Sequence, residues 1–151
     1  MLLLGFVISD KYKKQYRIVA SNNDLGDLKR FYILSGNARI GNVNYHFAGS
    51  EVLYLDDLHI RQDAILFPAY WWDVIVAKIY LPSLQWQTHN FQGRGIGTAM
   101  IEFLAEYARS MGAKRIEGHI KSNDLKINPD LPNWYLRRGF KMEGNKISRS
   151  L

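Results

Sequence analysis

The chain of 151 residues contains no cysteine. Disulfide bonds, catalysis by a thiolate and every zinc site with cysteine ligands are therefore excluded, and we expect no bound metal. The absence of cysteine fits a reducing compartment, so we predict a cytoplasmic protein. The length is that of one ordinary domain over residues 1–151, long enough to bury a hydrophobic core.

The apolar opening MLLLGFVIS is too short to be a membrane helix and lacks the basic start of a signal peptide. It reaches Asp10 and Lys11 well before the roughly 18 to 20 apolar residues that a membrane helix needs. We therefore predict a buried strand here and no membrane attachment.

Positive charge is in excess, but no run of Lys or Arg is longer than two residues. The formal net charge of +6 is compatible with an anionic ligand, and it slightly favours an anionic cofactor over a cationic acceptor. The basic residues are scattered from Lys11 to Arg149, and the aromatic cluster at 67–91 is poor in positive charge. We expect no nucleic-acid partner, because such proteins interleave surface aromatics with Lys and Arg.

The first sixty residues have the pattern of an antiparallel meander. β-Branched and aromatic runs alternate with short turns of Ser, Gly and Asn, which leave no room for crossover helices. The predicted strands are QYRIVAS (15–21), RFYIL (30–34), ARIGNVNYHF (38–47) and EVLYLDDLHI (51–60).

From residue 95 onward the apolar period becomes helical. One stripe of the predicted helix comprises Ile96, Met100, Leu104, Tyr107 and Met111, widened by Ile101 and Ala108, and Gly112 ends it. A strand (113–120), a loop (122–130), a short helix (131–138) and a last strand (140–144) follow, with Asp130 as the N-cap of the short helix. This order predicts an α/β (α+β) protein with a mixed, mostly antiparallel sheet flanked by helices.

Residues 61–91 fit this scheme poorly. They hold seven Phe, Tyr and Trp residues but only four charged residues, and two prolines interrupt them. A structureless loop of this length would be unusual in a compact domain, so we predict a strand or hairpin around WDVIVAKIYL (72–81).

The stretch QGRGIGT (92–98) places glycines at 93, 95 and 97 directly before the helix. A loop without side chains exposes backbone N–H groups, and the helix dipole adds partial positive charge, so a phosphate is the natural ligand. The loop lacks the Gly-Lys-Ser/Thr ending of a Walker A motif and the G-x-G-x-x-G spacing of a dinucleotide fingerprint. The plain alternative is a flexible turn without a ligand.

QGRGIG also resembles the Q/R-x-x-G-x-G/A signature of the GNAT superfamily of N-acetyltransferases. LDDLHI (55–60) is similar to the acidic strand of that family, and NWYLRRGF (133–140) resembles its helix ending in Y-x-x-x-G-F. The resemblance implies a GNAT-like fold and acetyl-coenzyme A as cofactor, with coenzyme A as product. It implies transfer of the acetyl group to a primary amine of a small molecule or protein that the sequence does not identify.

The resemblance also implies catalytic roles. Tyr135, four residues before Gly139, takes the place of the family's general acid, and a phenol stays protonated at neutral pH. Asp56 is our candidate for the general base, with His59 as the alternative because its pKa suits proton transfer. Strand alternation predicts Asp56, Leu58 and Ile60 on one face of the sheet.

Cofactor contacts are expected mainly from the backbone. By the family pattern the pantetheine arm pairs with the strand segment Leu58, His59 and Ile60. The pyrophosphate lies on the loop and helix start formed by Gln92, Gly93, Arg94, Gly95, Ile96, Gly97 and Thr98, with a charge-assisted contact from Arg94. Asn128 is ranked ahead of Asn123 and Asn133 as a further cofactor contact.

Two departures from the family pattern concern the acceptor. The two helices that usually follow the first strand are replaced by a short polar stretch, and about thirty residues, 61–91, are inserted before the glycine loop. We predict that the insertion forms a wall of the acceptor pocket; the alternatives are a homodimer surface or additional core. The alternative function is a non-catalytic acyl-coenzyme A sensor or protein-interaction module.

Overall fold

The structure is a computed structural model that describes residues 5–21, 26–61, 64–65, 88–89 and 91–151. Its strands are β1 (Phe6–Ser9), β2 (Gln15–Ala20), β3 (Lys29–Ser35), β4 (Ala38–Ala48), β5 (Val52–Ile60), β6 (Ala64–Ile65), β7 (Thr88–His89), β8 (Arg115–His119), β9 (Lys141–Glu143) and β10 (Lys146–Ser150). Its helices are α2 (Ile96–Ser110), α3 (Ser122–Ile127) and α4 (Leu131–Leu136). The strand or hairpin predicted around 72–81 lies outside the described residues.

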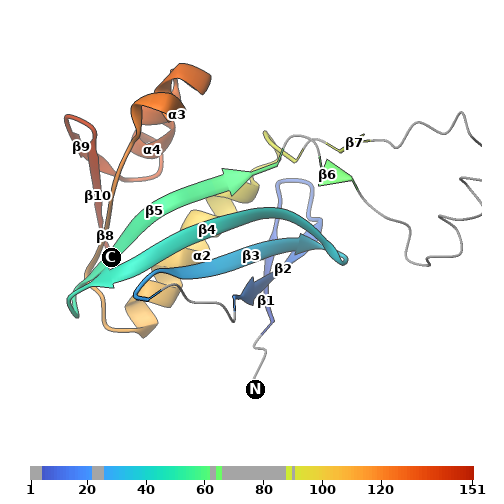
Figure 1. Cartoon of the computed structure of the whole chain (residues 1–151), viewed down its shortest axis with the longest axis horizontal. Helices are drawn as coiled ribbons and strands as arrows, with labels where there is room; N and C mark the ends of the chain where they lie inside the picture. The colour runs from blue at the N-terminus through green and yellow to red at the C-terminus, as the bar shows by residue number, and fades with distance from the viewer. Residues whose placement is uncertain (1–4, 22–25, 62–63, 66–87, 90) are drawn as a thin grey trace, which may run out of the picture.

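Eight of these strands form one sheet in the order β1-β2-β3-β4-β5-β8-β10-β9 (Figure 1). The first five pair as antiparallel neighbours, which confirms the predicted meander. β5 and β8 pair in parallel, and β8, β10 and β9 are antiparallel again. The prediction of a mixed, mostly antiparallel sheet is therefore confirmed, while β6 and β7 pair separately.

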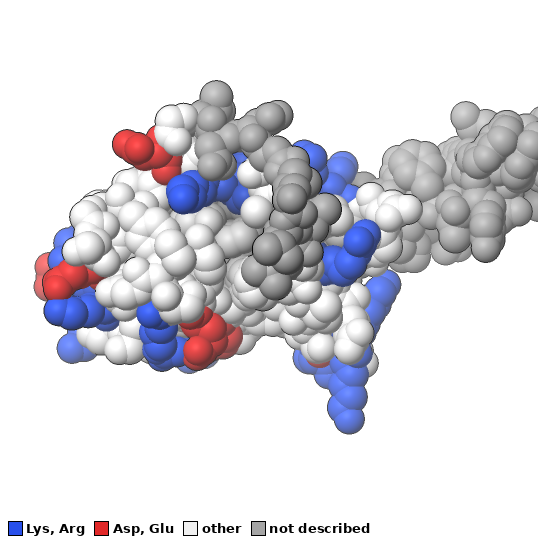
Figure 2. All heavy atoms as spheres, turned by 90° about the horizontal axis from the view of Figure 1, so that it is seen from below, with Lys and Arg blue, Asp and Glu red and all other residues white. Residues whose placement is uncertain are grey.

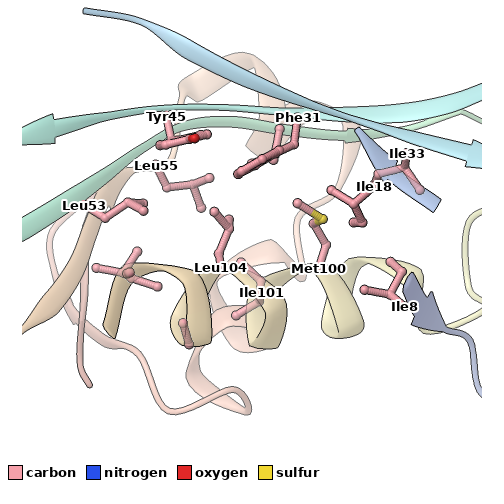
Figure 3. Packing of buried hydrophobic residues seen from close by; sticks show 14 of the residues in the cluster. Ile8, Ile18, Phe31, Ile33, Tyr45, Leu53, Leu55, Met100, Ile101 and Leu104 are labelled. Atoms are coloured by element: carbon pink, nitrogen blue, oxygen red, sulfur yellow. The ribbon is translucent and has the colours of Figure 1, made fainter. Parts of the chain in front are cut away.

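Helix α2 covers one face of the sheet and forms the core with it. In Figure 3, Leu104 of α2 points toward Leu53 and Leu55 of β5, and Met100 points toward Ile18 of β2. Ile101 of α2 belongs to the same core. All of these residues are at most 4% exposed, and burial of each such side chain contributes about 1.5–3 kcal/mol. The predicted apolar stripe is confirmed except at its end, where Met111 is 53% exposed.

The remaining predictions of elements differ from the structure in four places. The N-terminal strand is an edge strand in which Ile8 is buried and its neighbours are exposed, so the predicted buried strand is wrong. The segment predicted as a loop contains α3, which has no buried residue and hence no apolar period to reveal it. β10 was not predicted, because Ile147 alone is buried in it. Asp130 is the N-cap of α4, but its carboxylate makes no capping bond to the backbone.

A fork opens where β5 and β8 separate. The two strands pair only between Val52–Leu55 and 115–118, whereas β5 continues to Ile60. Beyond Leu55, no described strand pairs with the free edge of β5. The side-chain amide of Gln92 donates a hydrogen bond of 2.9 Å to the Ile60 carbonyl, so the glycine loop lies at the far end of the fork.

Candidate active site

Two adjoining cavities occupy this fork. One has a volume of about 490 Å³ and extends from β5 to the end of β8, and the other, of about 540 Å³, extends toward the glycine loop and α4. The residues common to both linings are Leu58, Gln92, Ile127, Asn128, Leu131 and Tyr135. We call the first the β8 cavity and the second the loop cavity.

The glycine loop is shaped to present its backbone. Gly93 and Gly95 have φ angles of 72° and 86°, a backbone conformation that residues other than glycine rarely adopt. α2 begins directly after Gly95, with no acidic residue in its first turn and no side chain capping it. A methyl group at Gly97 would lie 3.2 Å from the Trp134 ring, a tight contact that the ring could accept only by shifting a few tenths of an ångström. The loop leaves the N–H groups of the first helical turn to a ligand in the loop cavity.

Arg94 faces away from the loop cavity, toward the N-terminal hairpin. Its Nε donates a hydrogen bond of 2.9 Å to Asp10, whose side chain is completely buried. The Tyr16 hydroxyl and the backbone N–H groups of Tyr12 and Lys14 also donate to this carboxylate. Burial raises the pKa of Asp10, but the hydrogen bonds outweigh burial and lower the pKa to about 2. We predicted that the Arg94 side chain contacts a phosphate. It instead anchors the glycine loop to the N-terminal hairpin, on the side opposite the loop cavity.

Two other basic side chains line the loop cavity instead. Lys11 lies in the turn after β1, and its backbone N–H donates 2.9 Å to the Arg94 carbonyl. Arg138 stacks 3.8 Å above the Trp134 ring and donates hydrogen bonds of 2.8 and 2.6 Å from Nε and Nη2 to the Thr98 hydroxyl. No Asp or Glu is among the described residues lining this cavity. Neither cation was predicted from the sequence as a ligand contact.

Tyr135 stands where the two cavities meet. Its side chain is packed against Trp134 and Phe140, with ring centroids 4.9 and 5.3 Å away, and the residue is 8% exposed. Within the described part of the chain, the hydroxyl forms no hydrogen bond. Burial, and then the negative charges of Asp124 and Asp57, raise the pKa of Tyr135 to about 12. The phenol is therefore protonated at neutral pH.

A β-bulge in β5 changes the predicted faces of the acidic strand. Tyr45 of β4 opposes Leu55 and Asn44 opposes Asp57, so Asp56 has no opposite residue. Its carboxylate instead accepts a bond of 2.7 Å from Nδ1 of His46. Directly opposite strand neighbours share a face, which places Leu58 with buried Val43 on the core side and Asp56 on the other. The predicted common face of Asp56, Leu58 and Ile60 is wrong, because the extra residue shifts the alternation.

Comparison with known proteins agrees with this geometry. The model of the acetyltransferase (GNAT) family matches residues 68–140, a range that includes the glycine loop, α2 and Tyr135. Over these residues the chain is similar to the GNAT acetyltransferases. No curated protein matches the chain significantly by sequence.

Solved GNAT structures share the fold over most of the chain. The GNAT domain of S. lividans PAT is 12% identical with a TM-score of 0.63, and the similarity covers 97% of each chain. A GNAT family acetyltransferase from Elizabethkingia anophelis, crystallised with acetyl-CoA bound, is 12% identical with a TM-score of 0.57, over 84% of this chain and 78% of the other. The putative N-acetyltransferase YhhK from E. coli, bound to coenzyme A, is 11% identical with a TM-score of 0.56, over 87% and 77%.

Most of the predicted site residues meet in this fork. Asp56, His59 and Asn128 line the β8 cavity, and Leu58, Ile60, Gln92, Gly93, Gly95, Ile96, Gly97, Thr98 and again Asn128 line the loop cavity. Asn133 lies outside both linings, where its side chain donates 2.9 Å to Asp130. The side chain of His59 is exposed.

One side of the β8 cavity was not predicted from the sequence. Asp57, Asp124 and His119 line it, and the Tyr54 hydroxyl contacts Nδ1 of His119. Asp124 belongs to α3, whose existence the sequence did not indicate, so no pattern placed it near the fork. Nothing in the sequence sets Asp57 apart from its neighbour Asp56; the bulge brings both carboxylates to one cavity.

Proposed function

We propose that this GNAT-like domain transfers the acetyl group of acetyl-coenzyme A to a primary amine, with the cofactor in the loop cavity and the amine in the β8 cavity. The observation that carries the proposal is the position of Tyr135. Its side chain is buried, but its hydroxyl is open to the junction between a cavity lined by Lys11 and Arg138 and a cavity lined by carboxylates.

The loop cavity suits coenzyme A in shape and charge. The N–H groups at the start of α2 fit a pyrophosphate, and Lys11 and Arg138 supply positive charge for phosphate oxygens. The free edge of β5 at Leu58 and His59, before the Ile60 carbonyl that accepts from Gln92, offers backbone groups with which the amides of pantetheine can pair as a neighbouring strand would. Solved GNAT proteins of this fold bound to acetyl-CoA and coenzyme A support the choice of cofactor.

The reaction divides its proton transfers between two residues. The neutral amine nitrogen attacks the carbonyl carbon of the thioester, and the carbon–sulfur bond then breaks. Tyr135 donates its proton to the departing sulfur, while Asp56 accepts a proton from the nitrogen that has formed the amide. Because the pKa of Tyr135 is about 12, the phenolate formed is quickly protonated again, so the tyrosine is ready for the next turnover.

His46 supports Asp56 in the role of base. The 2.7 Å contact to Nδ1 orients the carboxylate, and both side chains are about one-third exposed, at 33% and 29%. A proton accepted at the cavity can therefore leave through the imidazole to solvent. His59, the alternative base, has no such partner among the described residues.

Two measurements test the function. Calorimetric titration with acetyl-coenzyme A is expected to show micromolar binding that is lost for an acetylated pantetheine lacking the 3′,5′-ADP half. Amine-dependent release of the coenzyme A thiol is then followed with a thiol reagent, which gives no background because the protein has no cysteine. Absence of binding at millimolar cofactor would exclude the proposed function.

A further inference from the structure

The two cavities of the fork differ sharply in charge. The loop cavity has Lys11 and Arg138 and no described carboxylate, whereas the β8 cavity has three carboxylates, those of Asp56, Asp57 and Asp124, and no described Lys or Arg. On the face shown in Figure 2, Lys and Arg lie in separate groups between uncharged and acidic surface. The excess of positive charge over the whole chain therefore does not extend into the β8 cavity.

Two of these carboxylates also lack a basic partner. Six acidic side chains elsewhere in the described structure form ion pairs with Lys or Arg, namely Asp10, Glu51, Glu102, Glu106, Glu117 and Asp130. Within the same described part, Asp27 and Glu143 form none, but both are exposed to solvent. Asp56 has His46 as its partner. Asp57 and Asp124 form no ion pair with any described residue, although both are half-buried at the cavity.

A second feature of the same cavity indicates a bound polar ligand. Tyr135 is 8% exposed, and its hydroxyl has no hydrogen-bond partner among the described residues while it faces the junction of the cavities. Although the side chain is buried, its oxygen is open to the cavity, so a polar group of a ligand can pair with the hydroxyl there. The negative charges of Asp57 and Asp124 both act on this hydroxyl, so all three groups belong to one site.

The rest of the lining is aliphatic. Leu55, Ile120, Ile127, Leu131 and Ile147 contribute apolar surface to the β8 cavity. A chain of methylene groups gains from burial against such walls, whereas a sugar would leave its hydroxyl groups without partners. The cavity thus offers separate places for an aliphatic chain and for positive charge.

From this arrangement we infer the class of acceptor: a linear aliphatic diamine or polyamine, whose second ammonium group is bound by Asp57 and Asp124 while the first amine is acetylated beside Tyr135. The inference rests on the proposed acetyltransferase function and deepens it. A carboxylate on the acceptor is repelled by the same two side chains, which excludes α-amino acids as good acceptors.

Three acceptors of equal chain length test the inference: 1,4-diaminobutane, butylamine and 4-aminobutanoate. We expect kcat/KM for the diamine to exceed that for the monoamine by at least about tenfold, and the amino acid to be the poorest, since an ionic hydrogen bond contributes about a factor of ten or more. Equal kcat/KM for diamine and monoamine would overturn the inference and leave the acetyltransferase function intact.

Variants of the two carboxylates locate the effect. Asp124→Asn and Asp57→Asn are each expected to reduce the preference for diamine over monoamine about tenfold, mainly through KM. Asp130→Asn is the matched control, because Asp130 lies close to α3 in sequence but outside both cavities, with Arg137 as its partner. A preference that survives in both cavity variants contradicts the inference.

A binding measurement separates this inference from the function on which it depends. If no amine releases coenzyme A, the proposed function fails, and the affinity of 1,4-diaminobutane for the protein saturated with coenzyme A is measured by calorimetry. Binding of the diamine that weakens about tenfold in Asp124→Asn still supports the carboxylate site. Diamine affinity no greater than that of butylamine rejects it.

Discussion

Asp10→Asn is expected to loosen the anchor of the glycine loop and to destabilise the whole domain. The substitution keeps the shape of the side chain but removes the charge that holds Arg94, and it replaces one acceptor oxygen with an amide NH₂ group. The lowering of the Asp10 pKa from 3.8 to about 2 gives the size of the effect. At about 1.4 kcal/mol per pKa unit, the folded state gains about 2 kcal/mol from the ionised carboxylate at neutral pH.

The assay is urea unfolding of the wild type and Asp10→Asn at several pH values. Since the pKa of Asp10 is lower in the folded state, the contribution is complete above the unfolded value of 3.8 and is lost as pH falls toward about 2. The difference between the two proteins should be about 2 kcal/mol and constant between pH 7 and 5, and should shrink below about pH 4.

A matched control and a second readout complete the test. Asp27→Asn changes an exposed carboxylate without a described ion pair, and its unfolding free energy should differ from the wild type by less than about 0.5 kcal/mol. Asp10→Asn should also weaken acetyl-coenzyme A binding, because Lys11 and Arg94 are joined by a backbone hydrogen bond at the same anchor. A loss of less than about 0.5 kcal/mol in Asp10→Asn at pH 7 would refute the reasoning.

Three further predictions concern the reaction. Tyr135→Phe should lower kcat by about 100-fold and leave the calorimetric affinity for acetyl-coenzyme A nearly unchanged; an unaltered rate would remove Tyr135 from the mechanism. His46→Gln should lower kcat, because the Asp56 carboxylate loses the contact that orients it, and an unchanged kcat would count against the pair. Replacing residues 66–87 by a short glycine-serine linker between the paired strands β6 and β7 should raise the acceptor KM without changing the affinity for acetyl-coenzyme A. Unchanged acceptor kinetics would contradict the prediction that the insertion forms a wall of the acceptor pocket.

The sequence predicted best where a local pattern decides the structure. The period of α2, the bare glycine loop before it and the turns of the meander are properties of neighbouring residues, and the described part of the structure has the helix, the loop and the turns at 36–37 and 49–51. The α3 helix escaped detection because it buries no side chain, and β10 because its stability comes from pairing with β8.

Features that depend on distant partners could not be predicted. Arg94 was expected at a phosphate, but its partner Asp10 lies 84 residues earlier in the chain. The bulge at Asp56 is set by the register with β4, which alternation along a single strand does not reveal. The net charge of +6 argued against a cationic acceptor. It was a poor guide, because a sum over the chain carries no information on how the charges are distributed between two cavities.

The free edge of β5 has a consequence for the protein without its cofactor. A strand edge with unpaired backbone groups is a template on which another chain can add, and it is therefore a place where aggregation starts. Beyond Leu55 this edge faces the fork, where pantetheine is proposed to lie. Bound coenzyme A would then shield this strand edge as well as carry the acyl group. At a coenzyme A concentration of 100 times its Kd, binding would add about 2.7 kcal/mol to the free energy of unfolding. Purified protein stored with coenzyme A should therefore stay monodisperse longer than protein stored without it.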